Sequence, residues 1–365
     1  MHATRRRRGV IRHTEGVKKR KVAILGATGT VGQRFISLLA CHPFFEIAAL
    51  TGSDRSVGMR YGEAVHWLLP QDLPDGVADM EVLPTDGSLD AEICFSALPT
   101  EAAGDLEAEL ARTGHHVFTN ASPHRMDPDV PLLLAEVNPD HAGALERQRR
   151  DRGWTGSIVA NGNCTSIHLN LALAPLQRDF GIERAVVTTM QALSGASYPG
   201  VPSLDALDNV VPYIGGEEEK VVDETNKFQG GWDGRDFVPA GIAMSVHCNR
   251  VSVRDGHTET VSLSLRGDPS VEQVKGSLRS FRGRPQERGL PTAPEHPIVV
   301  REEPNRPQPI LDRDAEKGMA STVGRVREDP VLGIKFVVLG HNTIRGAAGA
   351  SVLNAELLVA EGRLD

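Results

Sequence analysis

The chain has 365 residues, of which 40% are hydrophobic and 24% are charged, and its formal net charge is −8 at pH 7. This length allows two domains with sizeable cores, while the acidic balance argues against a general nucleic-acid binder. No uninterrupted apolar run approaches the roughly 18 residues that a membrane span needs. The four cysteines are widely spaced without a CxxC pair (Cys41, Cys94, Cys164, Cys248). This spacing indicates reduced thiols without disulfides or a metal centre, so we expect a cytoplasmic protein.

The first 21 residues differ from the rest of the chain. Residues 5–8, 12 and 18–21 are all basic, and Glu15 is the single acid among them. The segment has no apolar core, so it is not a secretory signal. We expect a disordered basic tail over 1–20, with a nucleic-acid-binding arm as the alternative.

Order is expected to begin at Lys21, where a glycine-rich loop joins a strand to a helix. The apolar run 22–25 predicts a buried strand, and an apolar-periodic helix runs through Leu39. The GxxGxxG spacing between them is a relative of the dinucleotide-binding fingerprint, whose glycines permit a tight turn, close approach of a pyrophosphate and close helix–strand packing. The residues expected at the cofactor are Gly26, Thr28, Gly29, Thr30, Val31 and Gly32.

The end of the second strand, predicted over 45–50, bears on the choice of cofactor. An NAD-specific site usually carries Asp or Glu there. Here Ser53, Arg55 and Ser56 follow the strand, and hydroxyls with a guanidinium suit a 2′-phosphate. The pattern favours NADP, although Asp54 could bind the ribose instead or lie in a solvated turn.

Strands and helices then alternate. The segments 91–98, 115–119 and 131–137 are predicted strands, and 100–112 is a predicted helix. This alternation predicts an α/β, doubly wound Rossmann-like domain.

The central motif lies between 158 and 173. A β-branched run stops at Asn161-Gly162-Asn163, Cys164 follows, and a largely apolar helix begins. A thiol at a helix N-terminus faces unpaired N–H groups and the positive end of the dipole, so we expect its pKa to be lowered. Cys164 is therefore a candidate nucleophile; the alternative is a small buried hydrophobe.

After Cys164 the pattern changes to long β-rich runs. They predict an α+β domain with a mainly antiparallel sheet, and they cover 185–192, 244–248, 250–253, 258–265 and 334–340. Segments 208–236 and 290–330 are polar, and we expect them at the surface or an oligomer interface. The predicted domains are a cofactor-binding unit (21–162 and 341–365, including a returning helix at 349–358) and a catalytic and dimerisation unit (163–340).

Several separated motifs resemble the aspartate-β-semialdehyde dehydrogenases. They are residues 26–32, Asn163-Cys164-Thr165, 191–196 and 250–258. Residues 96–99, 136–139 and 215–220 are similar to the archaeal and fungal branch. The resemblance covers nearly everything from Lys21 onward. It implies interconversion of L-4-aspartyl phosphate and aspartate 4-semialdehyde with NADP(H) and phosphate, in threonine, methionine and lysine synthesis, by a homodimer or homotetramer.

The resemblance also implies the catalytic roles. Cys164 would form a thioester, His257 would be the acid–base residue, and Gln191 would orient the substrate. On its own, a histidine in Asp255-Gly256-His257-Thr258 is more typical of a hairpin turn.

Substrate and cofactor contacts follow from the same resemblance. Arg250 would bind the substrate α-carboxylate, and we expect it on one hairpin with His257. Glu217 would pair with the ammonium, with the register of 217–219 open by one residue. Arg125 and Lys220 match the residues for the substrate phosphate, and Asn163 would help position the substrate. The further cofactor contacts are Ser96, Leu98, Ser194, Gly195 and Asn342.

Two departures from the family pattern leave room for another substrate. They are the segment 228–237, at the pocket rim or subunit interface, and Ser252, where proline is common. The alternatives are a malonyl-CoA reductase-like enzyme, recognisable by coenzyme A dependence, and a non-catalytic NADP-binding sensor. An N-acetyl-γ-glutamyl-phosphate reductase is disfavoured because its acylated amine leaves no cation for Glu217.

Overall fold

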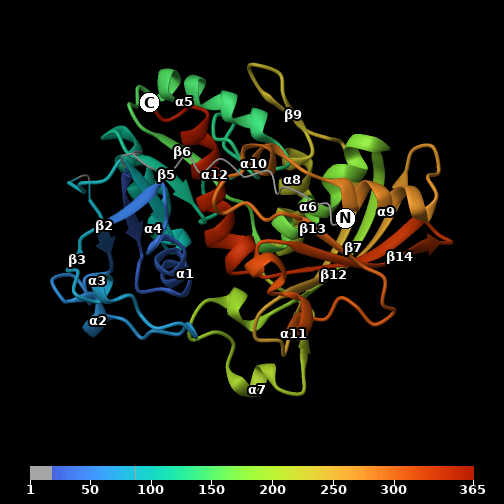
Figure 1. The fold of residues 1–365 in the computed structure, drawn as a ribbon, viewed down its shortest axis with the longest axis horizontal. Helices are drawn as coiled ribbons and strands as arrows, with labels where there is room; N and C mark the ends of the chain where they lie inside the picture. The colour runs from blue at the N-terminus through green and yellow to red at the C-terminus, as the bar shows by residue number, and fades with distance from the viewer. Residues whose placement is uncertain (1–18, 87) are drawn as a thin grey trace, which may run out of the picture.

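The structure is a computed structural model that describes residues 19–86 and 88–365 (Figure 1). All but the last two residues of the predicted basic tail lie outside this range. The described chain builds two large sheets side by side, with buried helices between them, and a small two-stranded hairpin (Figure 1). None of its helices is long and apolar enough to cross a membrane.

The first sheet has six parallel strands in the order β3-β2-β1-β4-β5-β6. The strands are β1 (Arg20–Leu25), β2 (Phe45–Thr51), β3 (Val82–Leu83), β4 (Ile93–Ser96), β5 (His116–Thr119) and β6 (Ser157–Ala160). The helices connecting them are α1 (Thr30–Leu39), α2 (Tyr61–Ala64), α3 (Asp75–Ala78), α4 (Thr100–Arg112), η1 (Pro139–Gly143) and α5 (Ala144–Arg152). The strand order reverses between β1 and β4, which is where doubly wound sheets bind their ligands. The predicted Rossmann-like fold is confirmed.

The prediction of a strand over 131–137 is wrong. The segment is buried and forms a single parallel bridge from Leu132 to Ala160. Two of its N–H groups donate to side chains instead of a neighbouring strand: Leu134 to Asn138, and Ala135 to Asn354. Its apolar composition therefore reflects burial rather than pairing.

The second sheet has seven strands in the order β13-β14-β15-β12-β7-β11-β8. The strands are β7 (Ile182–Gln191), β8 (Val210–Val211), β11 (Ala243–Val251), β12 (His257–Leu265), β13 (Ile298–Arg301), β14 (Ser321–Asp329) and β15 (Gly333–Gly340). The β7/β11 and β13/β14 pairs are parallel, and the other four pairs are antiparallel. The mainly antiparallel sheet is confirmed, with those two exceptions.

The two polar segments contain more structure than we expected. Strands β13 and β14 lie within 290–330, and helix α8 (Glu217–Phe228) lies within 208–236. Val221, Thr225 and Phe228 are buried on one face of α8 at three- to four-residue spacing, while Glu219 and Asp223 on the other face are exposed. The prediction of surface excursions is therefore wrong for α8, because a polar average concealed an amphipathic helix.

The segment 228–237, which departs from the family pattern, begins at the last residue of α8. It continues into a small hairpin, β9 (Gly231–Trp232) and β10 (Phe237–Val238). Trp232 and Phe237 pack on each other, and Phe237 packs on His141 of η1. The segment therefore links α8 to the first half of the chain.

Helix α6 (Cys164–Asp179) joins the two sheets. Residues 165–176 are all buried, so α6 is covered on every side, by the second sheet, α8 and α9. At the other end of the chain, α12 (Gly349–Ala360) returns to the first sheet and packs against α1 and β5 (Figure 1). The remaining helical segments are η2 (Leu193–Ala196), α7 (Ser203–Ala206), α9 (Val271–Ser280), α10 (Arg284–Arg288), α11 (Pro309–Asp312), η3 (Ala315–Gly318) and the π-helix η4 (Ile344–Ala348).

Candidate active site

The turn before Cys164 is built as the sequence predicts. Strand β6 ends at Ala160, and Cys164 is the first residue of α6. Asn163 caps the helix, since its side-chain oxygen accepts the Thr165 N–H at 2.9 Å. A Cβ on Gly162 would lie 2.7 Å from the Phe228 ring, so only glycine fits there. Local chemistry thus places the thiol at a helix N-terminus.

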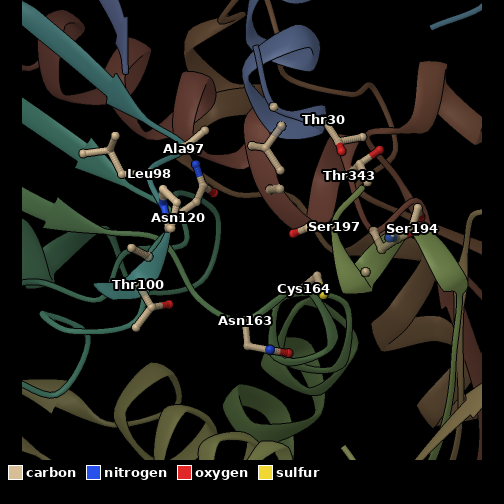
Figure 2. Close-up of a pocket in the computed structure, with 18 of the residues that line it drawn as sticks. Thr30, Ala97, Leu98, Thr100, Asn120, Asn163, Cys164, Ser194, Ser197 and Thr343 are labelled. Atoms are coloured by element: carbon tan, nitrogen blue, oxygen red, sulfur yellow. Dashed lines mark hydrogen bonds between the residues drawn. The ribbon is translucent and has the colours of Figure 1, made fainter. Parts of the chain in front are cut away.

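Cys164 lines a cavity of about 690 Å³ between the two sheets (Figure 2). The glycine-rich loop (Thr28–Val31) lies at one side of the cavity, and the segment after β4 (Ala97–Glu101) lies at another. Ser194 and Gly195 of η2 line it near the thiol. This volume accommodates a small substrate with part of a dinucleotide.

His257 is the direct partner of the thiol. Its Nε2 lies 3.0 Å from Cys164 Sγ, and its Nδ1 accepts the Ala192 N–H at 3.0 Å. A neutral imidazole carries one proton, and Nδ1 is already an acceptor, so the proton is on Nε2 and points at the sulfur. In this form His257 is a hydrogen-bond donor that stabilises a thiolate.

The electrostatics of this pair differ from our expectation. Burial, reinforced by the charge of Glu217, raises the pKa of the Cys164 thiol to about 12, although Arg125, Arg250 and the Thr165 N–H act in the opposite sense. The predicted lowering of the pKa is therefore wrong for the free protein, because desolvation outweighs the helix terminus. Burial also lowers the pKa of His257 well below 6.5, with His168 and Arg250 adding to the effect. The resting pair is neutral.

Arg250 and His257 do approach each other, but not on one hairpin. They lie on β11 and β12, which are separated by β7 in the sheet. A Cβ on Gly195 would lie 3.0 Å from Arg250 Nη1 and 3.1 Å from His257 Cε1, so both side chains border the same point. Arg250 is 8% exposed and donates to the Ala192 carbonyl at 2.9 Å. The shared neighbour β7 brings them together.

Helix α8 presents Glu217 to the site. Its two carboxylate oxygens accept from Asn163 Nδ2 at 2.9 and 2.8 Å, and Gln191 Nε2 lies 3.4 Å away. Glu218 turns to the edge of β11, where it accepts the Cys248 N–H, and Glu219 is exposed. Of the three glutamates, Glu217 is the one that faces the cavity. Gln191 is buried beside it and is absent from the cavity wall.

Two basic residues line the cavity on the side of α8. Arg125 is 8% exposed, and Lys220 is half-buried with its Nζ 3.9 Å from Glu217. Arg125 Nη1 donates to Glu224 at 2.8 Å, while its Nε has no partner among the described residues. We did not single out Glu224 from the sequence, although it opens the Glu-Thr-Asn-Lys motif at 224–227.

The expected cofactor residues divide into three groups. Those that line the cavity are Thr28, Gly29, Thr30, Val31, Leu98, Ser194, Gly195 and Asn342. Gly26 has φ +70°, and a Cβ on Gly32 would collide with the Gly26 carbonyl, so these two shape the loop from behind. The residues that are not part of the cavity wall are Ser53, Arg55, Ser56 and Ser96.

The side chains of that last group lie elsewhere. Ser53 and Arg55 are exposed in the turn after β2, and Ser56 is buried with its hydroxyl on the Ser53 carbonyl. The Ser96 hydroxyl donates to buried Glu107 at 2.6 Å. The cavity wall also includes residues that sequence reasoning missed, namely Gln33, His66, Asn120, Tyr198 and Thr343.

Two family models match the chain. Residues 21–145 match the semialdehyde dehydrogenase NAD binding domain, and residues 173–345 match the semialdehyde dehydrogenase dimerisation domain. The fold and the matched segments therefore define an oxidoreductase of the semialdehyde dehydrogenase class.

Relatives that match over almost their whole length narrow this class. An aspartate-semialdehyde dehydrogenase of Archaeoglobus fulgidus is 52% identical over 93% of this chain and 98% of its own. The crystal structure of aspartate semialdehyde dehydrogenase with NADP from Candida albicans has a TM-score of 0.87 at 42% identity, covering 95% of this chain and 100% of that one. Aspartate semialdehyde dehydrogenase II from Vibrio cholerae, complexed with ASA, has a TM-score of 0.76 at 27% identity, covering 94% and 99%. This chain belongs to the aspartate-semialdehyde dehydrogenase family, and its similarity to archaeal and fungal members is confirmed.

Proposed function

We propose that the chain interconverts L-4-aspartyl phosphate and L-aspartate 4-semialdehyde with NADP(H), using Cys164 as a covalent nucleophile. The observation that carries the proposal is the 3.0 Å contact between Cys164 Sγ and His257 Nε2. The thiol lines the cavity that the glycine-rich loop borders at its other side. A hydrogen-bonded thiol with a cofactor site within reach is the arrangement that acyl transfer followed by reduction requires.

In the reductive direction, the sulfur attacks the C4 carbonyl of the acyl phosphate. The C–S bond forms, the C–O bond to phosphate breaks, the thiol proton leaves with the released phosphate, and a thioester remains on Cys164. Hydride supplied by a bound NADPH would then replace the sulfur at C4, which would release the aldehyde and return a thiolate that takes up a proton. The high thiol pKa means that attack needs help, which the Nε2–H of His257 and the charges of Arg125 and Arg250 supply by stabilising the thiolate. To take up a proton on Nε2, His257 would have to adopt the other tautomer and release the Ala192 N–H.

Each charged group of the substrate would have a partner of opposite charge near the thiol. Arg250 would bind the α-carboxylate, and Glu217, with Gln191 and Asn163 beside it, would orient the ammonium end. Arg125 and Lys220 would bind the phosphate. The Vibrio cholerae relative complexed with ASA supports a substrate of this kind.

NADP fits the residues at the other end of the cavity. Gly26 and Gly32 hold the loop where a Cβ would collide, and the buried Thr30 Oγ1 lacks a partner in the described structure. Ser53, Arg55 and Ser56 would serve a 2′-phosphate, and Ser194 and Asn342 would lie near the nicotinamide, which supplies or accepts the hydride when bound. The relative crystallised with NADP supports this choice.

The broader organisation follows the same proposal. We infer a homodimer or homotetramer through the matched dimerisation domain, and a division into a cofactor unit (21–162 and 341–365) and a catalytic unit (163–340). All four cysteines are free thiols, which favours a reducing compartment such as the cytoplasm.

The test is NADP⁺ reduction by L-aspartate semialdehyde, with and without phosphate, for wild type, Cys164→Ala and the exposed-cysteine control Cys41→Ala. We expect phosphate-dependent turnover that only Cys164→Ala abolishes. Activity with malonyl-CoA and NADPH, but none with the semialdehyde, would overturn the substrate. NADPH binding without turnover of either would favour the sensor.

A further inference from the structure

The loop between β5 and Pro131 carries Arg125 to the cavity, although it has no regular structure. Arg125 is held there by two donated hydrogen bonds, from Nη1 to Glu224 at 2.8 Å and from Nη2 to the Asn120 carbonyl at 2.6 Å. Arg125 lines the cavity, and its remaining N–H groups are donors that an anion can use. The function of Arg125 therefore depends on what fixes this loop.

Glu224 connects the loop to the nucleophile. It is 1% exposed, and while Oε1 accepts from Arg125, Oε2 accepts the backbone N–H of Asn163 at 2.7 Å. Both partners are donors, so a carboxylate satisfies both and an amide could satisfy only one. Glu224 therefore links the anion-binding arginine to the turn directly before Cys164.

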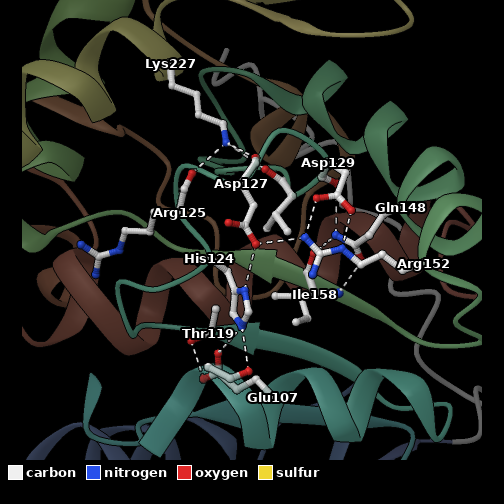
Figure 3. A network of polar contacts seen from close by, with 12 residues as sticks. Glu107, Thr119, His124, Arg125, Asp127, Asp129, Gln148, Arg152, Ile158 and Lys227 are labelled. Carbon is white, nitrogen blue, oxygen red and sulfur yellow. Dashed lines mark hydrogen bonds and ion pairs between the residues drawn. The ribbon is translucent and has the colours of Figure 1, made fainter. Parts of the chain in front are cut away.

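Lys227 holds the loop backbone from the same helix (Figure 3). It is 6% exposed, and its Nζ donates to three carbonyl oxygens of the loop: Arg125 at 2.7 Å, Asp127 at 3.0 Å and Val130 at 3.0 Å. An ammonium has three N–H donors, and all three have acceptors here. The Lys227 ammonium therefore holds three points of the loop backbone against helix α8.

The opposite side of the loop is tied to the first sheet and its helices. His124 Nδ1 lies 3.1 Å from Asp127, and Arg152 donates to Asp127 at 3.0 Å and to Asp129 at 2.6 Å (Figure 3). These contacts bind the side chains of Asp127 and Asp129, whereas Lys227 binds backbone carbonyl oxygens of the loop. Only Glu224 and Lys227 join the loop to α8 among the described ion pairs and hydrogen bonds.

We propose that Glu224 and Lys227 are positioning residues, which set Arg125 and the Asn163–Cys164 turn at a fixed separation for the anionic end of the substrate. This inference rests on the proposed phosphate role of Arg125. It assigns a task to the first and last residues of the Glu-Thr-Asn-Lys motif, neither of which faces the substrate itself. The pair acts across the two halves of the chain, so the phosphate site is completed only when α8 is docked.

The experiment measures steady-state NADP⁺ reduction by aspartate semialdehyde with phosphate varied. Lys227→Met keeps the length of the side chain and removes the donors, and Lys275→Met, a lysine on the surface helix α9, is the control. We expect the KM for phosphate to rise roughly 10- to 100-fold in Lys227→Met, which is the effect of a misplaced binding group. The KM for NADP⁺ should stay within about twofold, because the glycine-rich loop does not contact Lys227.

Three further variants make the test decisive. Arg125→Ala should raise the phosphate KM by itself, and the Arg125→Ala/Lys227→Met pair should be no worse than Arg125→Ala alone, because Lys227 acts through Arg125. Glu224→Gln should raise the phosphate KM as well, and it serves if Lys227→Met does not fold. An unchanged phosphate KM in Arg125→Ala would refute the proposed role of that arginine. A raised value in Arg125→Ala with normal values in Lys227→Met and Glu224→Gln would refute the positioning role alone, as would a parallel rise in the KM for NADP⁺.

Discussion

The charge of Glu217 has opposite effects on the reactivity of the thiol and on substrate binding, and this gives a sharp prediction. Glu217 raises the pKa of Cys164, whereas in the proposed mechanism it also pairs with the substrate ammonium. Glu217→Gln removes the charge and preserves the shape. The thiol should therefore become more reactive while the enzyme becomes less active.

The size of the effect follows from the position of the carboxylate. With an effective dielectric near 20, a unit charge in the same pocket contributes roughly 1.5–3 kcal/mol, or about one to two pKa units. At pH 8 a thiol with a pKa of about 12 is ionised to about one part in ten thousand, so Glu217→Gln should raise the thiolate fraction about 10- to 100-fold. A less basic thiolate is a weaker nucleophile, with a Brønsted slope of about 0.4–0.5, so the alkylation rate should rise about 3- to 16-fold.

The assay is the pseudo-first-order rate of iodoacetamide labelling at pH 8, read by mass spectrometry on the peptide that contains Cys164. Glu219→Gln is the matched control, because this exposed glutamate lies on the same helix and does not face the cavity. In parallel, kcat/KM for aspartate semialdehyde should fall roughly 10- to 150-fold in Glu217→Gln, the cost of losing a charged hydrogen bond. Labelling that is unchanged or slower in Glu217→Gln, or equally fast in Glu219→Gln, would refute the electrostatic reasoning.

Three other outcomes can be measured. Gly346→Ala should reduce kcat at least tenfold, since the new Cβ would lie 2.9 Å from the Cβ of the nucleophile; Gly276→Ala, with open space around it, should leave kcat unchanged. Glu136→Ala should lower the free energy of unfolding in urea by about 3–5 kcal/mol, because the fully buried Arg345 loses the carboxylate to which it donates at 3.0 and 2.6 Å. A loss below 1 kcal/mol would contradict this prediction. Finally, burial holds the pKa of His257 well below 6.5, so ¹⁵N NMR should find the neutral imidazole with the proton on Nε2 throughout pH 5.5–8. A titration of His257 near pH 6.5 would refute this assignment.

Much of the fold could be predicted because its signals are local. The strand–glycine loop–helix unit at 22–39 and the strand–turn–helix unit ending in α6 are where expected. Hydrophobic periodicity, caps and glycines with required conformations act within a few residues of one another. Prediction from local signals failed at 131–137, which is buried but does not pair as a strand. It also failed at α8, an amphipathic helix inside a polar stretch.

The sequence by itself determined the Rossmann-like half, the place of Cys164 at the start of a helix and the family. Only the tertiary structure decided which glutamate faces the cavity, how β7 brings Arg250 and His257 to the same point, and that Glu224 and Lys227 hold the Arg125 loop. It also reversed the expected direction of the thiol pKa. The physical reason is that a cap or a turn depends on neighbours along the chain, whereas burial, charge–charge coupling and register depend on residues that are distant in sequence, 209 positions in the case of Glu136 and Arg345.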